Sequence, residues 1–226
     1  MSLPVHPEVP RDTLTGTELA VGGSSGPLLR PALNFAPELL LRAQPVKVVF
    51  FDVDGVLTDG GLYFSEYVQG DALEAVSPGR QYAAGETLKR FNTLDGQGLK
   101  LLQKAGITPV VITGRDSVVL RARLQALDIV HAHFATEDKR PAAESTLKAL
   151  GLDWTQAAAM GDDWPDLPVM RRAAFSCAPS NAHVEARAVA HYVTRTCGGQ
   201  GAARELCDLL LVASGRYAGL LAEYSQ

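Results

Sequence analysis

The segment that most constrains the fold is an apolar strand that ends in two aspartates. Residues 46–51 are apolar apart from Lys47, and they lead directly into Asp52-Val53-Asp54-Gly55. Side chains two residues apart on a strand point the same way, so Asp52 and Asp54 should lie together where this strand ends. Two carboxylates at such a place repel each other and are costly to desolvate, and a divalent cation relieves that conflict. The segment therefore predicts a core strand that ends at a Mg²⁺ site.

Strands alternate with helices along the rest of the chain. We expect strands at residues 46–51, 107–113, 129–134, 157–160, 174–177 and 191–194. We expect helices at residues 94–105, 118–127, 140–150, 167–172 and 202–213. This alternation predicts an α/β fold of the Rossmann-like, three-layer type, with a parallel sheet between two layers of helices. Ligands of such sheets bind at the carboxyl ends of the strands.

Two segments depart from the alternating pattern. Residues 1–45 are rich in proline and glycine, which predicts a poorly ordered N-terminal extension with a short helical turn at residues 38–42. Residues 46–226 should then form one domain with a hairpin insert at residues 60–92. We expect residues 60–64 and 87–91 to pair as the arms of this hairpin, which would form a small flap beside the acidic pair.

Composition argues against several classes of protein. The formal net charge of −4 gives no electrostatic case for binding nucleic acid or an anionic membrane. No apolar run is long enough to span a bilayer, and we find no secretory signal. The three cysteines, Cys177, Cys197 and Cys207, lack Cys-x-x-Cys spacing, so we interpret them as thiols in a reducing compartment.

Polar motifs follow three of the expected strands and predict phosphoryl transfer. Asp52 is the expected nucleophile, which would form an aspartyl-phosphate, and Asp54 is the expected general acid and base. Thr113, at the end of the second strand, and Lys139, at the start of a helix, should hold the phosphoryl oxygens.

The same motifs predict the metal ligands. Gly161 is followed by Asp162 and Asp163 at the end of another expected strand. We predict that Mg²⁺ binds Asp52, Asp54 through its backbone carbonyl, Asp162 and, directly or through a second layer of contacts, Asp163.

In this order of motifs the chain resembles the haloacid dehalogenase superfamily of phosphatases, over nearly all of residues 46–226. A closer resemblance is to the 3-deoxy-D-manno-octulosonate 8-phosphate phosphatase family. The stretches that carry it are residues 52–60, 111–115, 161–170, 191–195 and 198–211.

The resemblance implies a function and an assembly. It implies Mg²⁺-dependent hydrolysis of a sugar-acid phosphate in lipopolysaccharide precursor synthesis, by a cytoplasmic homotetramer whose hairpins replace a full cap domain. It also implies that eight residues bind the substrate: Asn92, Thr93, Asp95, Gly96, Lys100, Gly114, Arg115 and Arg123.

Departures from the family pattern leave alternatives open. Leu94 and Gln200 stand where the family usually has arginine, Lys100 replaces another common arginine, and the hairpin is longer than usual. A phosphatase of a related nonulosonic acid 9-phosphate therefore remains possible. A receiver-like, phosphorylatable signalling domain uses similar residue types, but Asp54, two residues after Asp52, favours turnover over stable phosphorylation.

Overall fold

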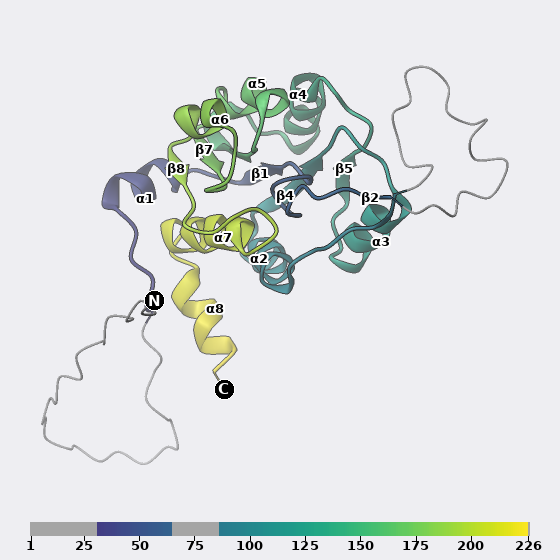
Figure 1. Ribbon diagram of the computed structural model, residues 1–226. Helices are drawn as coiled ribbons and strands as arrows, with labels where there is room; N and C mark the ends of the chain where they lie inside the picture. Colours follow the sequence, from purple (N-terminus) through teal and green to yellow (C-terminus); the bar gives the residue numbers. More distant parts are fainter. Residues whose placement is uncertain (1–30, 65–85, 226) are drawn as a thin grey trace, which may run out of the picture.

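A six-stranded parallel sheet forms the centre of the computed structural model, which describes residues 31–64 and 86–225 (Figure 1). The strand order is β5-β4-β1-β6-β7-β8. The strands are β1 (Val48–Phe51), β4 (Thr108–Ile112), β5 (His131–His133), β6 (Ala157–Met160), β7 (Phe175–Ala178) and β8 (Tyr192–Val193). The predicted α/β fold is confirmed, and each observed strand overlaps a predicted one.

Helices cover both faces of the sheet, as Figure 1 shows. On one face lie α1 (Pro37–Ala43), α2 (Thr93–Lys104), α3 (Val118–Ala126) and α7 (Ala202–Ala213). On the other lie α4 (Lys139–Leu150), α5 (Leu167–Met170) and α6 (Val184–Val189). Two 3₁₀ turns, η2 (Trp154–Gln156) and η3 (Trp164–Asp166), flank β6, and α8 (Tyr217–Glu223) follows α7. Helices α6 and α8 were not predicted; both are short, and together they bury only Ala186.

Strand β1 is apolar on both sides because both of its faces are covered. Val48 and Phe50 pack in the cluster under α4, α5 and α6, whereas Val49 and Phe51 pack in the cluster under α2, α3 and α7. All four side chains are at most 3% exposed. A continuous apolar run is typical of a central strand in a parallel sheet.

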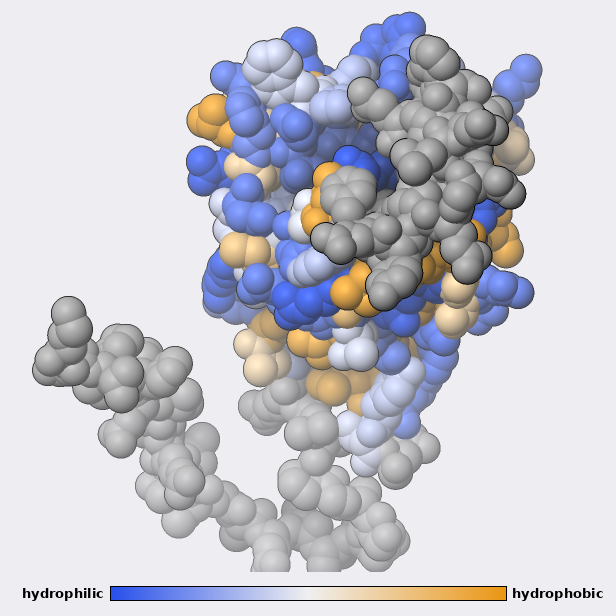
Figure 2. All heavy atoms as spheres, turned by 45° about the vertical axis from the view of Figure 1, so that its right-hand side comes forward, coloured by the Kyte–Doolittle hydropathy of each residue, from blue (hydrophilic) through white to orange (hydrophobic). Residues whose placement is uncertain are grey.

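The hairpin arms pair as predicted, in shorter form. Strand β2 (Tyr63–Phe64) is antiparallel to β3 (Glu86–Leu88), and Tyr63 lies opposite Leu88. Residues 65–85, which include most of the predicted flap, lie outside the described residues. Figure 2 brings forward the side that carries β2 and α3, where hydrophilic side chains predominate over the upper part.

The predicted N-terminal extension is described only from residue 31 onward. There α1 contains the helical turn that was predicted at residues 38–42, and it contacts α7. Ala43 is buried in the core, and Leu39 and Leu40 pack against it. In the described part of the chain, no helix is long and apolar enough to cross a membrane.

The strand order places a topological switch point beside β1. The chain runs from β1 outward to β4 and β5, then returns to the opposite side of β1 with β6 and continues to β7 and β8. Open α/β sheets bind ligands at the carboxyl ends of strands at such a point. Residues that follow β1, β4 and β6 therefore share one edge.

Candidate active site

A cleft of about 510 Å³ opens where the carboxyl ends of β1, β4 and β6 meet. The residues that line it are Asp52, Asp54, Thr113, Gly114, Arg115, Thr136, Glu137, Lys139, Asp162, Asp163, Pro165 and Asp166. Every residue that the sequence predicted for catalysis or metal binding is in this set. The fold therefore brings together motifs that lie up to 111 positions apart, from Asp52 to Asp163.

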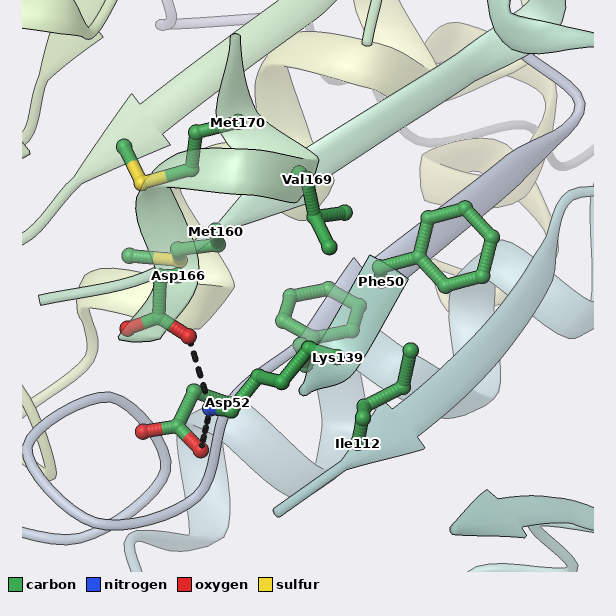
Figure 3. A pocket seen from close by; sticks show the side chains of 10 residues that line it. Phe50, Asp52, Ile112, Lys139, Met160, Asp166, Val169 and Met170 are labelled. Atoms are coloured by element: carbon green, nitrogen blue, oxygen red, sulfur yellow. Dashed lines mark hydrogen bonds and ion pairs between the residues drawn. The ribbon is translucent and has the colours of Figure 1, made fainter. Parts of the chain in front are cut away.

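Lys139 joins two carboxylates at the floor of the cleft. Its ammonium lies 2.6 Å from Asp52 Oδ1 and 2.7 Å from Asp166 Oδ1, and Figure 3 shows it between them. The side chain is 6% exposed. Burial alone would lower the pKa of Lys139, but the charges of Asp52 and Asp166 outweigh burial and raise that pKa. Lys139 therefore stays protonated and supplies a fixed positive charge beside Asp52.

The acidic side chains of Asp52, Asp162 and Asp166 form a cluster at the same place. One carboxylate oxygen of each lies within 4.8 Å of the others. Burial and the charge of Asp166 raise the pKa of Asp52 to about 7. Burial and the charge of Asp52 raise the pKa of Asp162 to about 8. Three carboxyl groups this close resist ionisation because their negative charges repel each other. A hard divalent cation bound to their oxygens would relieve that repulsion.

Asp166 was not among the predicted site residues. Its Oδ1 pairs with Lys139, and its Oδ2 accepts hydrogen bonds from the backbone N–H groups of Asp162 and Asp163, at 3.0 and 3.2 Å. Gly161 makes room for it, because a Cβ at that position would lie 2.2 Å from Asp166 Cβ. The available signal was a third acidic residue five positions after Gly161.

Asp163 lies at the edge of this arrangement. It lines the cleft but is exposed, and with Asp166 it forms a capping box at the start of η3. It is not part of the three-carboxylate cluster. Its assignment as a metal ligand stays a prediction.

Asp54 is held by two basic side chains. Its Oδ1 lies 2.6 Å from the ammonium of Lys89, and its Oδ2 lies 3.6 Å from Arg115 Nε. The side chain of Asp54 is 20% exposed and faces the cleft. Lys89 was not predicted, because nothing in the local sequence marks it.

Thr113 and Gly114 form the turn that follows β4. Thr113 is 1% exposed, and its backbone N–H donates to the carbonyl of His133, which continues the parallel ladder. The Thr113 hydroxyl oxygen accepts a hydrogen bond from the Arg115 backbone N–H, at 3.2 Å. This turn brings Arg115 to the cleft, so two of the eight predicted substrate residues, Gly114 and Arg115, line it.

The other six predicted substrate residues do not line the cleft. Asn92 is the N-cap of α2 and accepts a hydrogen bond from Leu94 N, at 2.8 Å. Thr93 and Lys100 are exposed on α2. Arg123 lies over Gly96, where a Cβ would be 2.3 Å from Arg123 Nη2, and this nitrogen is 3.4 Å from the Asn92 carbonyl. Their roles in substrate binding stay predictions.

Asp95 makes its hydrogen bonds within the protein. It is 2% exposed and accepts hydrogen bonds from the backbone N–H groups of Gly201, at 3.3 Å, and Arg204, at 2.8 Å. Burial raises the pKa of Asp95, and these hydrogen bonds oppose the shift. The carboxylate thus ties the start of α2 to the start of α7.

A glycine turn before α7 supports the loop that follows Asp54. The Gly199 N–H donates to the Val56 carbonyl, at 2.9 Å. A Cβ on Gly198 would lie 1.7 Å from the Gly55 carbonyl oxygen, so the two backbones are in direct contact. The turn therefore forms part of the support of the loop rather than part of the cleft wall.

Comparison with known proteins identifies relatives of this chain. Residues 118–206 match the model of a family described as haloacid dehalogenase-like hydrolase. The 3-deoxy-D-manno-octulosonate 8-phosphate phosphatase of Yersinia pestis is 38% identical over 81% of this chain and 89% of its own length.

Solved structures with the same fold include two phosphatases described with metal ions. The enzyme from Moraxella catarrhalis, in complex with a magnesium ion, a phosphate ion and a KDO molecule, has a TM-score of 0.73 and 33% identity, covering 83% of this chain and 98% of its own. The cobalt-bound deoxy-D-mannose-octulosonate 8-phosphate phosphatase from Haemophilus influenzae has a TM-score of 0.68 and 35% identity. The match covers 78% of this chain and 93% of that enzyme's chain.

Proposed function

This chain belongs to the 3-deoxy-D-manno-octulosonate 8-phosphate phosphatase family of haloacid dehalogenase-like hydrolases, and we propose that it acts as its relatives are named. It hydrolyses 3-deoxy-D-manno-octulosonate 8-phosphate to the free sugar acid and phosphate. The observation that carries the proposal is the pair Asp52 and Asp54 in one cleft. Asp52 lies beside Lys139, whereas Asp54 lies beside two cations, Lys89 and Arg115. The two acids therefore have different surroundings. Different surroundings allow two carboxylates to take different roles.

In the first step an Asp52 oxygen attacks phosphorus, and the bond from phosphorus to the sugar oxygen breaks. The product on the enzyme is an aspartyl-phosphate. The sugar alkoxide is a poor leaving group, so Asp54 donates a proton to it as it departs. Thr113 and Lys139 line the cleft, where they can bind the phosphoryl oxygens.

In the second step Asp54 takes a proton from water, and the hydroxide attacks the aspartyl-phosphate. The bond from phosphorus to the Asp52 oxygen breaks, and phosphate is released. Asp54 is then protonated again and ready for the next sugar phosphate. One carboxyl group thus serves as acid and then as base.

A divalent cation fits the acidic cluster, and we propose that it is Mg²⁺. Asp52 and Asp162 would hold it, with Asp166 beside them and the predicted contributions of Asp54 and Asp163. When bound, it would neutralise the charge of the phosphoryl group as that group approaches the carboxylates.

Arg115 and Leu94 bear on which sugar acid is bound. Arg115 faces the cleft, and a guanidinium is well suited to a sugar carboxylate. Leu94, 55% exposed at the start of α2, stands where the family usually has arginine. This residue keeps a nonulosonic acid 9-phosphate as the second candidate substrate.

The assembly is also part of the proposal. Leu62, Tyr63 and Leu88 are 41, 44 and 57% exposed on the two-stranded ribbon of β2 and β3 or just before it. An isolated ribbon with exposed apolar side chains gains stability by packing on another surface. With the family relationship, these side chains support a homotetramer in which the hairpins meet, and the family relationship alone supports a cytoplasmic location.

A substrate panel tests the function. The protein is incubated with 3-deoxy-D-manno-octulosonate 8-phosphate, a nonulosonic acid 9-phosphate and a neutral sugar phosphate, with Mg²⁺ or with chelator, and released phosphate is measured. We expect the octulosonate to have the highest kcat/KM and chelator to abolish activity. Preference for the neutral sugar phosphate, or full activity in chelator, would refute the proposal.

A further inference from the structure

Lys89 is a buried lysine that contacts Asp54 of the active site. It follows β3 directly, its side chain is 1% exposed, and its ammonium lies 2.6 Å from Asp54 Oδ1. It is not among the residues that line the cleft. Lys89 is therefore placed to act on Asp54 rather than on a bound substrate.

The two oxygens of Asp54 have different neighbours. Oδ1 is bound to Lys89, whereas Oδ2 lies beside Arg115, whose side chain is 30% exposed and lines the cleft. The last torsion of an aspartate is broad, so a carboxylate without such a contact samples many orientations. A charge-assisted hydrogen bond to one oxygen fixes the plane of the group and aims the other oxygen.

We propose that Lys89 is a positioning residue for the proton transfers of this enzyme. By binding Oδ1, it holds Asp54 with Oδ2 toward the cleft, where that oxygen can give a proton to the leaving sugar and take one from water. The proposal rests on the proposed function, because it assumes that Asp54 is the acid and base. Small errors in the placement of a proton donor reduce rates by large factors.

The position of Lys89 in the chain links the hairpin to the chemistry. The return arm carries Lys89 to Asp54, and the next residue, Arg90, lies 3.5 Å from Asp59 in the loop that follows Asp54. The side chain of Arg90 is 59% exposed. Lys89 and Arg90 are thus neighbours on one arm that contact the same loop, Lys89 from a buried position and Arg90 from the surface. A substitution of Arg90 is therefore a matched control for a substitution of Lys89.

The test compares Lys89→Met with Arg90→Met on the sugar-acid phosphate. Methionine keeps an unbranched apolar stem but cannot bind Asp54. We expect kcat to fall about 100-fold in Lys89→Met with KM within about threefold, and both constants to change less than about twofold in Arg90→Met. Lys89→Arg can still donate to Asp54 and should recover part of the loss. A kcat for Lys89→Met close to that of the unsubstituted enzyme, or a loss confined to KM, would overturn the proposal.

A second substrate, p-nitrophenyl phosphate, separates a positioning role from a structural one. Its leaving group departs without a proton, whereas hydrolysis of the aspartyl-phosphate still needs Asp54 as base. Lys89→Met should therefore release a burst of nitrophenol about equal to the enzyme concentration, followed by slow turnover. Equal losses on both substrates without a burst would mean that Lys89 only supports the fold.

Two further measurements keep the result interpretable. If thermal unfolding shows that Lys89→Met is not folded, Lys89→Gln is used, and the same loss of kcat and the same burst are required of it. If the unsubstituted enzyme cleaves p-nitrophenyl phosphate but no sugar-acid phosphate, the proposed substrate is wrong, and the burst in the variant then decides the role of Lys89.

Discussion

At the scale of single residues, Asp52 and Asp162 occupy a site that resists their ionisation. Burial and the negative charges around them raise the pKa of Asp52 to about 7 and that of Asp162 to about 8. Lys139 offsets only part of the repulsion at Asp52. A ligand that binds the folded state alone stabilises it by mass action, so a cation that relieves this repulsion should stabilise the fold.

Mg²⁺ should therefore raise Tm, and Asp162→Asn should remove most of that rise because it deletes one of the three clustered acids. Asp128→Asn is the control, since Asp128 is exposed after α3, does not line the cleft and lies outside the cluster. The shift in Tm is measured with and without Mg²⁺ after treatment with chelator. Equal Mg²⁺-induced shifts in the two variants would contradict the placement of the cation beside Asp162.

At the scale of elements, the glycine turn before α7 and the loop after Asp54 act as one packed unit. The Gly198 backbone lies against the Gly55 carbonyl, and Gly199, with φ +65°, donates to Val56. Asp95 fixes the start of α7 from α2. The loop that carries Asp54 therefore depends on a contact with a distant helix.

Gly198→Ala should lower the free energy of unfolding by about 2 kcal/mol, because the new Cβ must displace the Gly55 backbone. Activity should fall with stability, since the displaced loop carries Asp54. Gly219→Ala in α8 is the control: a Cβ there meets nothing within 4 Å, and alanine favours the helix by up to about 1 kcal/mol. Denaturant unfolding measures both variants, and equal stabilities would show that the turn can move freely.

A second contact between elements links α1 to the sheet. Arg42 Nη1 lies 2.9 Å from His191 Nε2, and the Ser176 backbone N–H donates to His191 Nδ1 at 2.9 Å. Burial and the charge of Arg42 lower the pKa of His191. The unfolded chain therefore binds a proton more readily than the folded one, and stability from this group is lost as pH falls below about 6.5.

His191→Asn should reduce the loss of Tm on acidification. Asparagine can still accept the Ser176 hydrogen bond through its side-chain oxygen, but it does not titrate. We expect Tm to fall less between pH 7.5 and 5.5 in the variant than in the unsubstituted protein. Other titrating groups are common to both proteins and cancel in the difference, so identical pH profiles would contradict the role of His191.

At the scale of the whole molecule, the exposed apolar residues of the hairpin predict self-association. Tyr63 and Leu88 lie opposite each other across β2 and β3, and both are exposed in a single chain. Tyr63→Glu with Leu88→Glu should dissociate the proposed homotetramer and lower activity, because buried carboxylates are strongly unfavourable in an interface. Ultracentrifugation gives the mass, with Val118→Glu, which changes an 83% exposed side chain on α3, as control. An unchanged mass of the hairpin variant would exclude this interface.

Local chemistry explains why much of the active site could be predicted from the sequence. Asp52 and Asp54 follow an apolar run, and Thr113 and Asp162 follow two others. In a parallel sheet all carboxyl ends lie at one edge, so the order of motifs along the chain predicts their convergence. The cleft contains every residue predicted for catalysis and metal binding.

The parallel α/β fold and the acids at its strand ends could be predicted from the sequence, because both depend on local periodicity and on one rule of sheet geometry. Which groups hold those acids, and which hold the buried Asp95 of α2, could be seen only in the folded chain. Lys89 reaches Asp54 across 35 positions, and Asp95 reaches Gly201 across 106. Such contacts depend on how separate helices and hairpin arms pack against each other. Residues far apart in the sequence come within hydrogen-bond distance only when the whole chain has folded.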